Sequence, residues 1–343
     1  MRKLKYLLNV IPIILAVAIF ILYSYYTTYN KPNSTKGTHY LYIYSFAKYS
    51  DILDSLKTNE LIINLRSFER AAKKMDLEHT FKAGRYKVEE GMSNKQIITK
   101  IILNDQAPLN LVIAESIRNR EKLAKIIDNK IERNYEEIIA ALNNDSIIRK
   151  YGFNNHTFIS MFLPYTYEIY WTTTLNDLLD KFKNSYDKFW NKERVEKAKK
   201  LGMSKSEVAT LASIVYQESK VSQEQPIIAG VYINRIRRGI PLQADPTIIF
   251  ALNDYSIRRV LKRHLEVKSP YNTYKIKGLP PGPISLAPLS TVDAVLNYTK
   301  HKYMYFCASP EFNGRHLFAE TLAGHNKNAL AYRRALNLRN IKK

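Results

Sequence analysis

Residues 204–246 read SKSEVATLASIVYQESKVSQEQPIIAGVYINRIRRGIPLQADP and hold the most informative pattern of this 343-residue chain. Ser204 followed by Glu207 is typical of a capping box, in which each side chain binds the other residue's free backbone N–H at a helix start. Apolar residues then recur at helical spacing, at Val208, Leu211, Ala212 and Val215. The pattern predicts a helix that begins after Ser204.

The apolar stripe of this helix, extended by one turn, reaches Glu218 and Ser219. A carboxylic acid is therefore expected where a core residue is usual, near the end of a helix. Burial and the negative end of the helix dipole both disfavour the charged form and raise the pKa. A raised pKa suits a general acid that works near neutral pH. The alternative is that the helix frays before Glu218 and the carboxylate is solvated, since charged residues are seldom buried.

A second helix is predicted directly after the first. Ser222 and Gln225 have capping-box spacing, and Pro226 suits the first turn of a helix. The helix is expected to stop at Gly239, because glycine readily adopts the left-handed conformation found at helix C-termini.

Loops rich in polar and aromatic residues follow this helix. Gln243 and Asp245 are expected on a loop, with Asp245 held extended by the Pro246 that follows it. Residues 269–284, SPYNTYKIKGLPPGPI, form a longer loop of the kind that usually binds a ligand. Two strands, in YMYFCAS and GRHLFAE, and a last helix in HNKNALAYRRALN then close the chain.

The N-terminus has the pattern of a membrane anchor. Arg2, Lys3 and Lys5 precede an uncharged apolar run over residues 6–26, which is long enough to cross a bilayer. A cleaved signal peptide is the alternative, but no small-residue cleavage site follows the run. The basic residues place the N-terminus in the cytoplasm, so the rest of the chain is expected outside the cytoplasmic membrane, with a single pass.

The net charge of +22 is interpreted in the light of that topology. Strongly basic proteins often bind nucleic acid. An exported domain meets little of it, and its anionic neighbours are lipid headgroups and cell-wall polymer. We therefore expect no nucleic-acid partner. The single cysteine, Cys307, excludes an internal disulfide and is expected to be a buried small hydrophobe.

The predicted fold class is α+β. Residues 1–5 are a cytoplasmic tail, residues 6–26 the transmembrane helix and residues 27–38 a polar linker. A strand at 39–45, helices at 50–57 and 65–75, and a strand in AGRYKVEEGMS suggest a small α+β module over residues 39–108. Residues 109–343 form the second, mixed domain, which is mostly helical over 119–200 and has an aromatic stretch at 162–171 that is expected to belong mainly to the core.

Eight short segments, in order over residues 204–330, resemble the YceG-like (MltG) family of endolytic murein transglycosylases: ASIVYQES, VYINR, LQADPT, SPYNTY, GLPPGPI, YFCAS, GRHLF and GHN. AGRYKVEEGMS is similar to the N-terminal, LysM-like part of that family. The resemblance implies a LysM-like module followed by a YceG-like catalytic domain.

The resemblance implies cleavage of the β-1,4 bond between N-acetylmuramic acid and N-acetylglucosamine in peptidoglycan glycan strands. Glu218 would protonate the glycosidic oxygen and then take a proton from the muramic acid C6 hydroxyl, which closes a 1,6-anhydro ring. It also implies action beside the peptidoglycan synthases, where cutting ends the growth of nascent strands. No cofactor and no metal ion are implied.

Asp245 is the ambiguous residue. If it faces Glu218, it could activate water, and the enzyme would be a muramidase-type hydrolase with two carboxylates. We expect instead that it helps to bind the substrate, together with Asn234, Gln243, Tyr271 and Asn272. For each of these residues the alternative is a purely structural role. The non-enzymatic alternative for the whole chain is an inactive wall-binding scaffold.

His316, Glu320 and His325 are residue types that bind metal ions. The first two are four residues apart in a strand-like run, where that spacing separates side chains more than it does on a helix, and no HExxH pattern is present. Hydrogen bonding within the loops and the core is the expected role of these residues.

Overall fold

The computed structural model describes residues 2–339, and side chains from residue 10 onward. Its first helix is α1 (Arg2–Tyr25), which continues into the π-helical turn η1 (Tyr26–Asn30). Among the described residues, one helical stretch, Val10–Asn30, is long and apolar enough to cross a membrane. The orientation predicted from Arg2, Lys3 and Lys5 rests on side chains outside the described ones and stays a prediction.

The chain divides into two compact units. The first comprises residues 1–110, 130–132 and 168–174, and the second comprises residues 111–129, 133–167 and 175–343. Within residues 2–339, six short strands pair in three two-stranded sheets, β1–β2, β3–β4 and β5–β6. This mixture of helices and small sheets agrees with the expected fold class at the level of α and β content.

The first unit contains the predicted strand, two helices and strand in order, with the short helix α4 added between the second of these helices and the second strand. Its elements are β1 (Thr38–Ile43), α2 (Tyr49–Thr58), α3 (Leu65–Lys74), α4 (Leu77–Thr80), β2 (Gly84–Glu89) and α5 (Asn94–Ile102). The strands are antiparallel, with Thr38 opposite Glu89 and Ile43 opposite Gly84. Leu41 and Ile43 are buried and Tyr42 is exposed, as alternation along a strand requires.

The segment predicted to be a polar linker is packed into the first unit. Asn33 and Ser34 are 5% and 4% exposed. The Asn33 side-chain amide donates to the carbonyl oxygen of Asn64 at 3.0 Å and to Asn94 Oδ1 at 2.6 Å. Its Oδ1 accepts from the Asn64 backbone N–H at 2.8 Å. The composition is that of a linker, but distant partners satisfy the polar groups and fix the segment.

The second unit is mainly helical. The elements before the site region are β3 (Leu109–Val112), α6 (Arg120–Asp128), α7 (Tyr135–Leu142), α8 (Asp145–Lys150), η2 (Phe158–Met161), β4 (Thr166–Ile169), α9 (Leu175–Phe189) and α10 (Lys192–Leu201). The division between the units passes through β3 and β4, and Trp171 belongs to the first unit. In the aromatic stretch 162–171, Phe162, Tyr167 and Trp171 are buried, whereas Tyr165 and Tyr170 are exposed. The core interpretation is therefore confirmed for the three buried rings.

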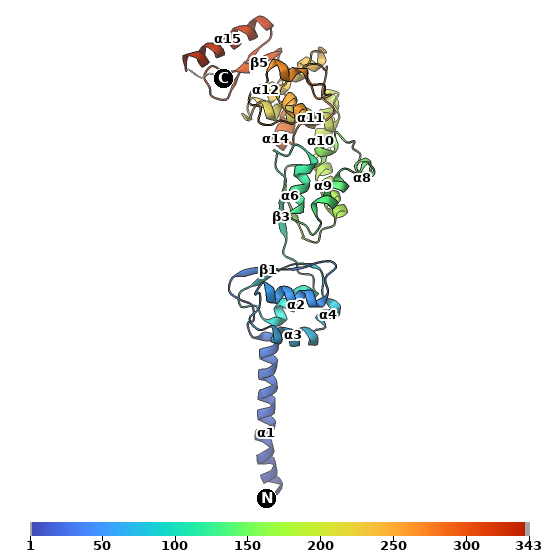
Figure 1. Ribbon diagram of the computed structural model, residues 1–343, viewed down its shortest axis with the longest axis vertical. Helices are drawn as coiled ribbons and strands as arrows, with labels where there is room; N and C mark the ends of the chain where they lie inside the picture. The colour runs from blue at the N-terminus through green and yellow to red at the C-terminus, as the bar shows by residue number, and fades with distance from the viewer. Residues whose placement is uncertain (1, 340–343) are drawn as a thin grey trace. The chain divides into compact units, whose positions relative to one another are not determined.

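The site lies on the elements that follow. These are α11 (Lys205–Glu218), α12 (Gln225–Arg237), α13 (Asp245–Leu252), η3 (Lys262–Glu266), α14 (Leu289–Leu296), β5 (Tyr305–Ala308), β6 (His316–Ala319) and α15 (Leu322–Leu338). Helix α11 packs against α10, α12 and α14 (Figure 1). It is thus held on several sides, which makes its C-terminal end a firm platform for a functional group.

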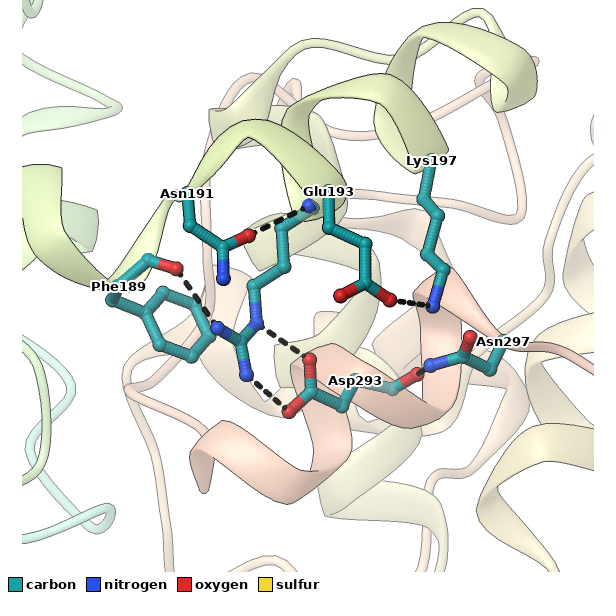
Figure 2. Close-up of polar contacts among 7 residues, drawn as sticks. Phe189, Asn191, Glu193, Lys197, Asp293 and Asn297 are labelled. Carbon is teal, nitrogen blue, oxygen red and sulfur yellow. Dashed lines mark hydrogen bonds and ion pairs between the residues drawn. The ribbon is translucent and has the colours of Figure 1, made fainter.

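A bidentate ion pair joins α10 to α14, two of the helices that pack against α11. Arg194 donates from Nε and Nη2 to the Asp293 carboxylate at 2.7 and 2.9 Å. Its Nη1 donates to the Phe189 carbonyl oxygen at 3.0 Å. Figure 2 shows Asp293 at the centre of these contacts, with Asn297 on the same helix bonded to its carbonyl oxygen. Two parallel N–H···O bonds fix orientation as well as distance.

The predicted start of the second site helix needs one correction. Helix α12 begins at Gln225 with a proline in its first turn, as expected, and Gly239 beyond its end has a φ of 65°. The capping box of Ser222 and Gln225 is wrong, because the N-cap residue is Glu224 and its side chain makes no capping bond. The Gln225 side chain instead donates to the Ser219 carbonyl oxygen at 3.1 Å.

Candidate active site

Helix α11 ends at Glu218, so the prediction of an ordered helix is confirmed and the fraying alternative is wrong. The capping box is present: Ser204 Oγ accepts from Glu207 N–H at 3.2 Å, and Glu207 returns a bond to Ser204 N–H at 2.7 Å. The predicted apolar stripe is fully buried. Glu218 itself is half-buried, and the next residue, Ser219, is 4% exposed.

Glu218 opens onto a cavity of about 410 Å³. The α11 and α12 helices, the 242–245 segment, the 269–284 loop, the β5–β6 hairpin and the start of α15 all contribute to its wall. The lining residues are Glu218, Tyr232, Arg235, Leu242, Gln243, Asp245, Tyr274, Tyr305, Phe306, Cys307, Ala308, His316, Leu322 and His325. Of the predicted site residues, the cavity brings together Glu218, Gln243 and Asp245.

The electrostatics of Glu218 are those of an acid near neutral pH. Burial, and to a smaller extent the negative charge of Asp245, raise the pKa of Glu218 from 4.5 to about 7. The Tyr232 hydroxyl, which donates to Glu218 Oε1 at 2.9 Å, and the charge of Arg235 act in the opposite direction. Because burial dominates, the carboxyl group retains its proton at pH values where an exposed glutamate has lost it.

Arg235 supplies a buried positive charge to the cavity wall. Its guanidinium donates to the carbonyl oxygens of Met304 (2.7 Å), Leu242 (2.8 Å) and Pro241 (3.2 Å), and to Gln243 Oε1 (3.2 Å). Within residues 10–339 it forms no ion pair with a carboxylate. Burial lowers its pKa. The group therefore ties the 241–243 segment to Met304, the residue before β5, and leaves its charge available to the cavity.

The structure corrects the predicted conformation of Asp245. This residue is the first of α13, and the preceding Ala244 is the extended one. An acid in the first turn of a helix is stabilised by the helix dipole, and Pro246 fits the same turn because no N–H is needed there. Asp245 Oδ1 accepts from the Tyr274 hydroxyl at 2.5 Å, and both residues line the cavity.

Three predicted substrate-binding residues lie outside the cavity lining. The Asn234 amide donates to the carbonyl oxygens of His301 (2.8 Å) and Tyr303 (3.0 Å). Asn272 is completely buried, with its amide bonded to two carbonyl oxygens of the preceding segment. The ring of Tyr271 packs against an aromatic neighbour at 4.7 Å. These contacts favour the structural alternative for all three residues, whose role in binding stays a prediction.

Sequence reasoning missed several residues of the cavity wall. Tyr232 and Arg235 stand three apart on α12, in VYINR, and Tyr274 ends SPYNTY. Spacing on α12 was an available signal, since residues three apart share a helix face. Cys307 was expected to be buried, but it is half-exposed and lines the cavity.

The structure gives His316, Glu320 and His325 separate surroundings. His316 pairs with Glu224, Glu320 is exposed, and His325 stacks on Tyr305 with ring centroids 5.4 Å apart. Across residues 10–339 no group of three His, Cys, Asp or Glu side chains has the arrangement of a metal site.

Comparison with known proteins gives consistent results. A model of the YceG-like family matches residues 41–331. The endolytic murein transglycosylase of Bacillus subtilis (strain 168) is 30% identical over 311 residues, which are 85% of this chain and 84% of that protein. The endolytic murein transglycosylase of Streptococcus pneumoniae serotype 2 is 28% identical over 222 residues, 62% of this chain and 39% of that protein.

A solved structure is also similar. The crystal structure of a putative YceG-like protein from Listeria monocytogenes aligns with a TM-score of 0.56 and 28% identity, over 84% of this chain and 98% of that chain.

Proposed function

This chain belongs to the YceG-like family, and we propose that it is an endolytic murein transglycosylase in which Glu218 is the catalytic acid and base. The observation that carries the proposal is the state of Glu218. It stands at the end of a firmly packed helix, opens onto a cavity, and has its pKa raised by burial to about 7. Such a group holds a proton for donation near neutral pH and accepts one readily afterwards.

The reaction then follows from one carboxyl group. The Tyr232 hydroxyl donates to Oε1, so the transferable proton is carried on Oε2. Glu218 gives that proton to the glycosidic oxygen between N-acetylmuramic acid and N-acetylglucosamine as the C1–O bond breaks. The carboxylate next accepts the proton of the muramic acid C6 hydroxyl, whose oxygen bonds to C1. The protein returns to its starting state, and no water is consumed.

Positive charge in the wall supports the first step, in which Glu218 gives up its proton. The Glu218 carboxylate that forms in the first step lies near the guanidinium of Arg235, and the buried phenol of Tyr232 continues to donate to it. Both groups are fixed before the reaction, so they stabilise the developing charge without reorganising.

Asp245 is assigned to substrate positioning in this scheme, together with Gln243. It is an exposed residue whose Oδ1 is occupied by the Tyr274 hydroxyl. The second candidate function, a muramidase-type hydrolase, uses Asp245 as the base for water. The observation that favours this alternative is that Glu218 and Asp245 line the same cavity, as the two carboxylates of a hydrolase must.

The setting of the enzyme is also part of the proposal. The apolar helix at Val10–Asn30 would anchor the chain in the cytoplasmic membrane with the N-terminus inside. The module over residues 39–108 would be LysM-like and would bind glycan. The enzyme would cut nascent strands beside the peptidoglycan synthases and so end their elongation.

The experiment compares the full chain with Glu218→Gln and Glu207→Gln on purified peptidoglycan. The Glu207 change is a matched control, because glutamine also completes a capping box at the other end of the same helix. Release of soluble fragments should fall by about 10²- to 10⁴-fold in Glu218→Gln and stay near the wild-type rate in Glu207→Gln. Equal rates in all three proteins would refute Glu218 as the catalytic residue.

A further inference from the structure

A carboxylate–histidine pair is built into the wall of the active-site cavity. Glu224 Oε1 accepts from the backbone N–H of His316 at 2.8 Å, and Oε2 lies 2.9 Å from Nδ1 of the same residue. The two side chains are only 9% and 14% exposed. One carboxylate thus holds both the backbone and the ring of a single histidine, which fixes the orientation of the imidazole.

The same pair is tied to the end of the catalytic helix. The Ser219 hydroxyl donates to Glu224 Oε2 at 3.4 Å, and Ser219 directly follows Glu218. The neighbour of Glu224, Gln225, donates to the Ser219 carbonyl oxygen at 3.1 Å. The turn between α11 and α12 is therefore connected to β6, so that His316 and Glu218 are held in one rigid frame.

His316 is also part of the cavity lining, and the nitrogen of its ring that Glu224 does not bind is Nε2. Because the carboxylate accepts the proton of Nδ1, the neutral ring has an unprotonated Nε2 that accepts hydrogen bonds. No donor within residues 10–339 reaches this nitrogen. The ring stands edge-on to Phe306, another lining residue, with centroids 5.3 Å apart.

A second imidazole on the same wall is also short of partners. Nδ1 of His325 is buried and has no hydrogen-bond partner among the described residues. Burial lowers the pKa of His325, which favours the neutral ring with its acceptor nitrogen. Buried polar groups are nearly always paired in folded proteins, so this one is expected to meet a ligand or a bound water.

We propose that His316 is a substrate-contacting residue whose Nε2 accepts a hydrogen bond from an O–H or acetamido N–H donor of the amino sugar in the cavity, and that Glu224 is its positioning residue. The inference rests on the proposed function and adds a sugar subsite on the β5–β6 hairpin. Amino sugars carry several O–H and N–H donors, which match an acceptor that the protein itself leaves unpaired.

The test uses two substitutions, each of which replaces one of the two ring nitrogens of His316 and removes the other. His316→Asn places an amide N–H where Nδ1 stands, keeps the donor to Glu224, and removes Nε2. His316→Gln extends an amide toward the position of Nε2 and loses the Nδ1 donor. Soluble, uncross-linked glycan strands with pentapeptide stems serve as the substrate for the full chain.

For His316→Asn we expect an unchanged Tm and a KM raised by about 5- to 10-fold, the effect of one lost hydrogen bond, with kcat altered less. For His316→Gln and Glu224→Gln we expect a lower Tm. The KM of His316→Gln should lie between that of the wild type and that of His316→Asn, because its amide reaches toward the position of Nε2. A wild-type KM in a folded His316→Asn protein would overturn the proposal. The proposed function would stand if Glu218→Gln were still inactive.

A second measurement does not depend on whether the His316 variants fold. Histidine labelled with ¹⁵N is introduced into Glu218→Gln, in which we expect glycan to bind and to be cut only slowly. Adding the same glycan strands should shift the Nε2 resonance of His316. This resonance is assigned by its loss in the Glu218→Gln, His316→Asn double variant. If that variant does not fold, it is assigned by its through-bond link to the resonance of Nδ1, the nitrogen that is hydrogen-bonded to Glu224. A resonance that does not move at saturating glycan would contradict the contact.

Discussion

The hydroxyl of Tyr232 donates to Glu218 Oε1 across 2.9 Å, between two helices that are consecutive in the chain. The phenol is 1% exposed and the carboxyl half-buried. This contact fixes which oxygen carries the proton, and Arg235 one turn further along α12 adds positive charge. The acid–base properties of the site are therefore set by the packing of α11 against α12.

The pH dependence of the reaction should report Glu218. Only the protonated group can donate to the glycosidic oxygen, and its pKa is about 7. We expect kcat/KM, which reflects the free enzyme, to fall as pH rises through about 7. Initial rates on soluble glycan between pH 5 and pH 9 measure this limb. A limb that begins near pH 4.5, the ordinary value for glutamate, would contradict it.

Glu218 should also make the stability of the protein depend on pH. The folded chain holds this proton up to about pH 7, whereas the unfolded chain loses it near pH 4.5. Its contribution is therefore fully present below pH 4.5 and is lost as pH rises through about 7. Glu218→Gln removes this dependence. The free energy of unfolding of the variant, relative to that of the wild type, should therefore be higher at pH 8 than at pH 4 by up to about 3 kcal/mol. Urea unfolding at the two pH values measures the difference.

Tyr232→Phe should shift the pH profile of kcat/KM to higher pH. The substitution removes a donor that stabilises the carboxylate, so the pKa of Glu218 rises further. We expect kcat to fall by about 10- to 100-fold, because a hydrogen bond to the charged form is lost. Tyr298→Phe is the control, since it removes a hydroxyl contact with Arg237 outside the cavity. A wild-type profile in Tyr232→Phe would show that the contact has no catalytic effect.

Arg235→Lys should destabilise the protein although the charge is kept. Lysine has no planar fork that can reach Met304 on one side and Leu242 on the other. We expect a loss of about 2–4 kcal/mol in the free energy of unfolding, because buried carbonyl oxygens lose their donors. The exposed Arg238→Lys is the matched control from the same helix end. A loss below 1 kcal/mol in Arg235→Lys would contradict the anchoring role.

The parts of the site that depend on local sequence could be predicted. The capping box of Ser204 and Glu207 and the apolar stripe after it define α11 and place Glu218 at its end. These signals lie within one helix, where backbone geometry alone relates the residues. The strand–helix–helix–strand order of the first unit was predictable for the same reason.

The rest depends on contacts between distant segments. In SPYNTY, Asn272 is buried and Tyr274 lines the cavity. Only the path of the loop determines which of its side chains is buried and which reaches the cavity. Asn33 belongs to a segment with the composition of a linker, but its partners Asn64 and Asn94 are far away in sequence. The pairing of Glu224 with His316 spans 92 positions and leaves no local trace.

The central claim is that the C6 hydroxyl of the sugar, not water, attacks C1 with Glu218 as the single carboxylate involved. The most direct measurement is mass spectrometry of the products formed in oxygen-18 water by the wild type and by Asp245→Asn. We predict 1,6-anhydro-muramic acid ends without the heavy oxygen from both proteins, more slowly from the variant. Reducing ends that carry oxygen-18 in the wild type, lost in Asp245→Asn, would contradict the account and identify a hydrolase with two carboxylates.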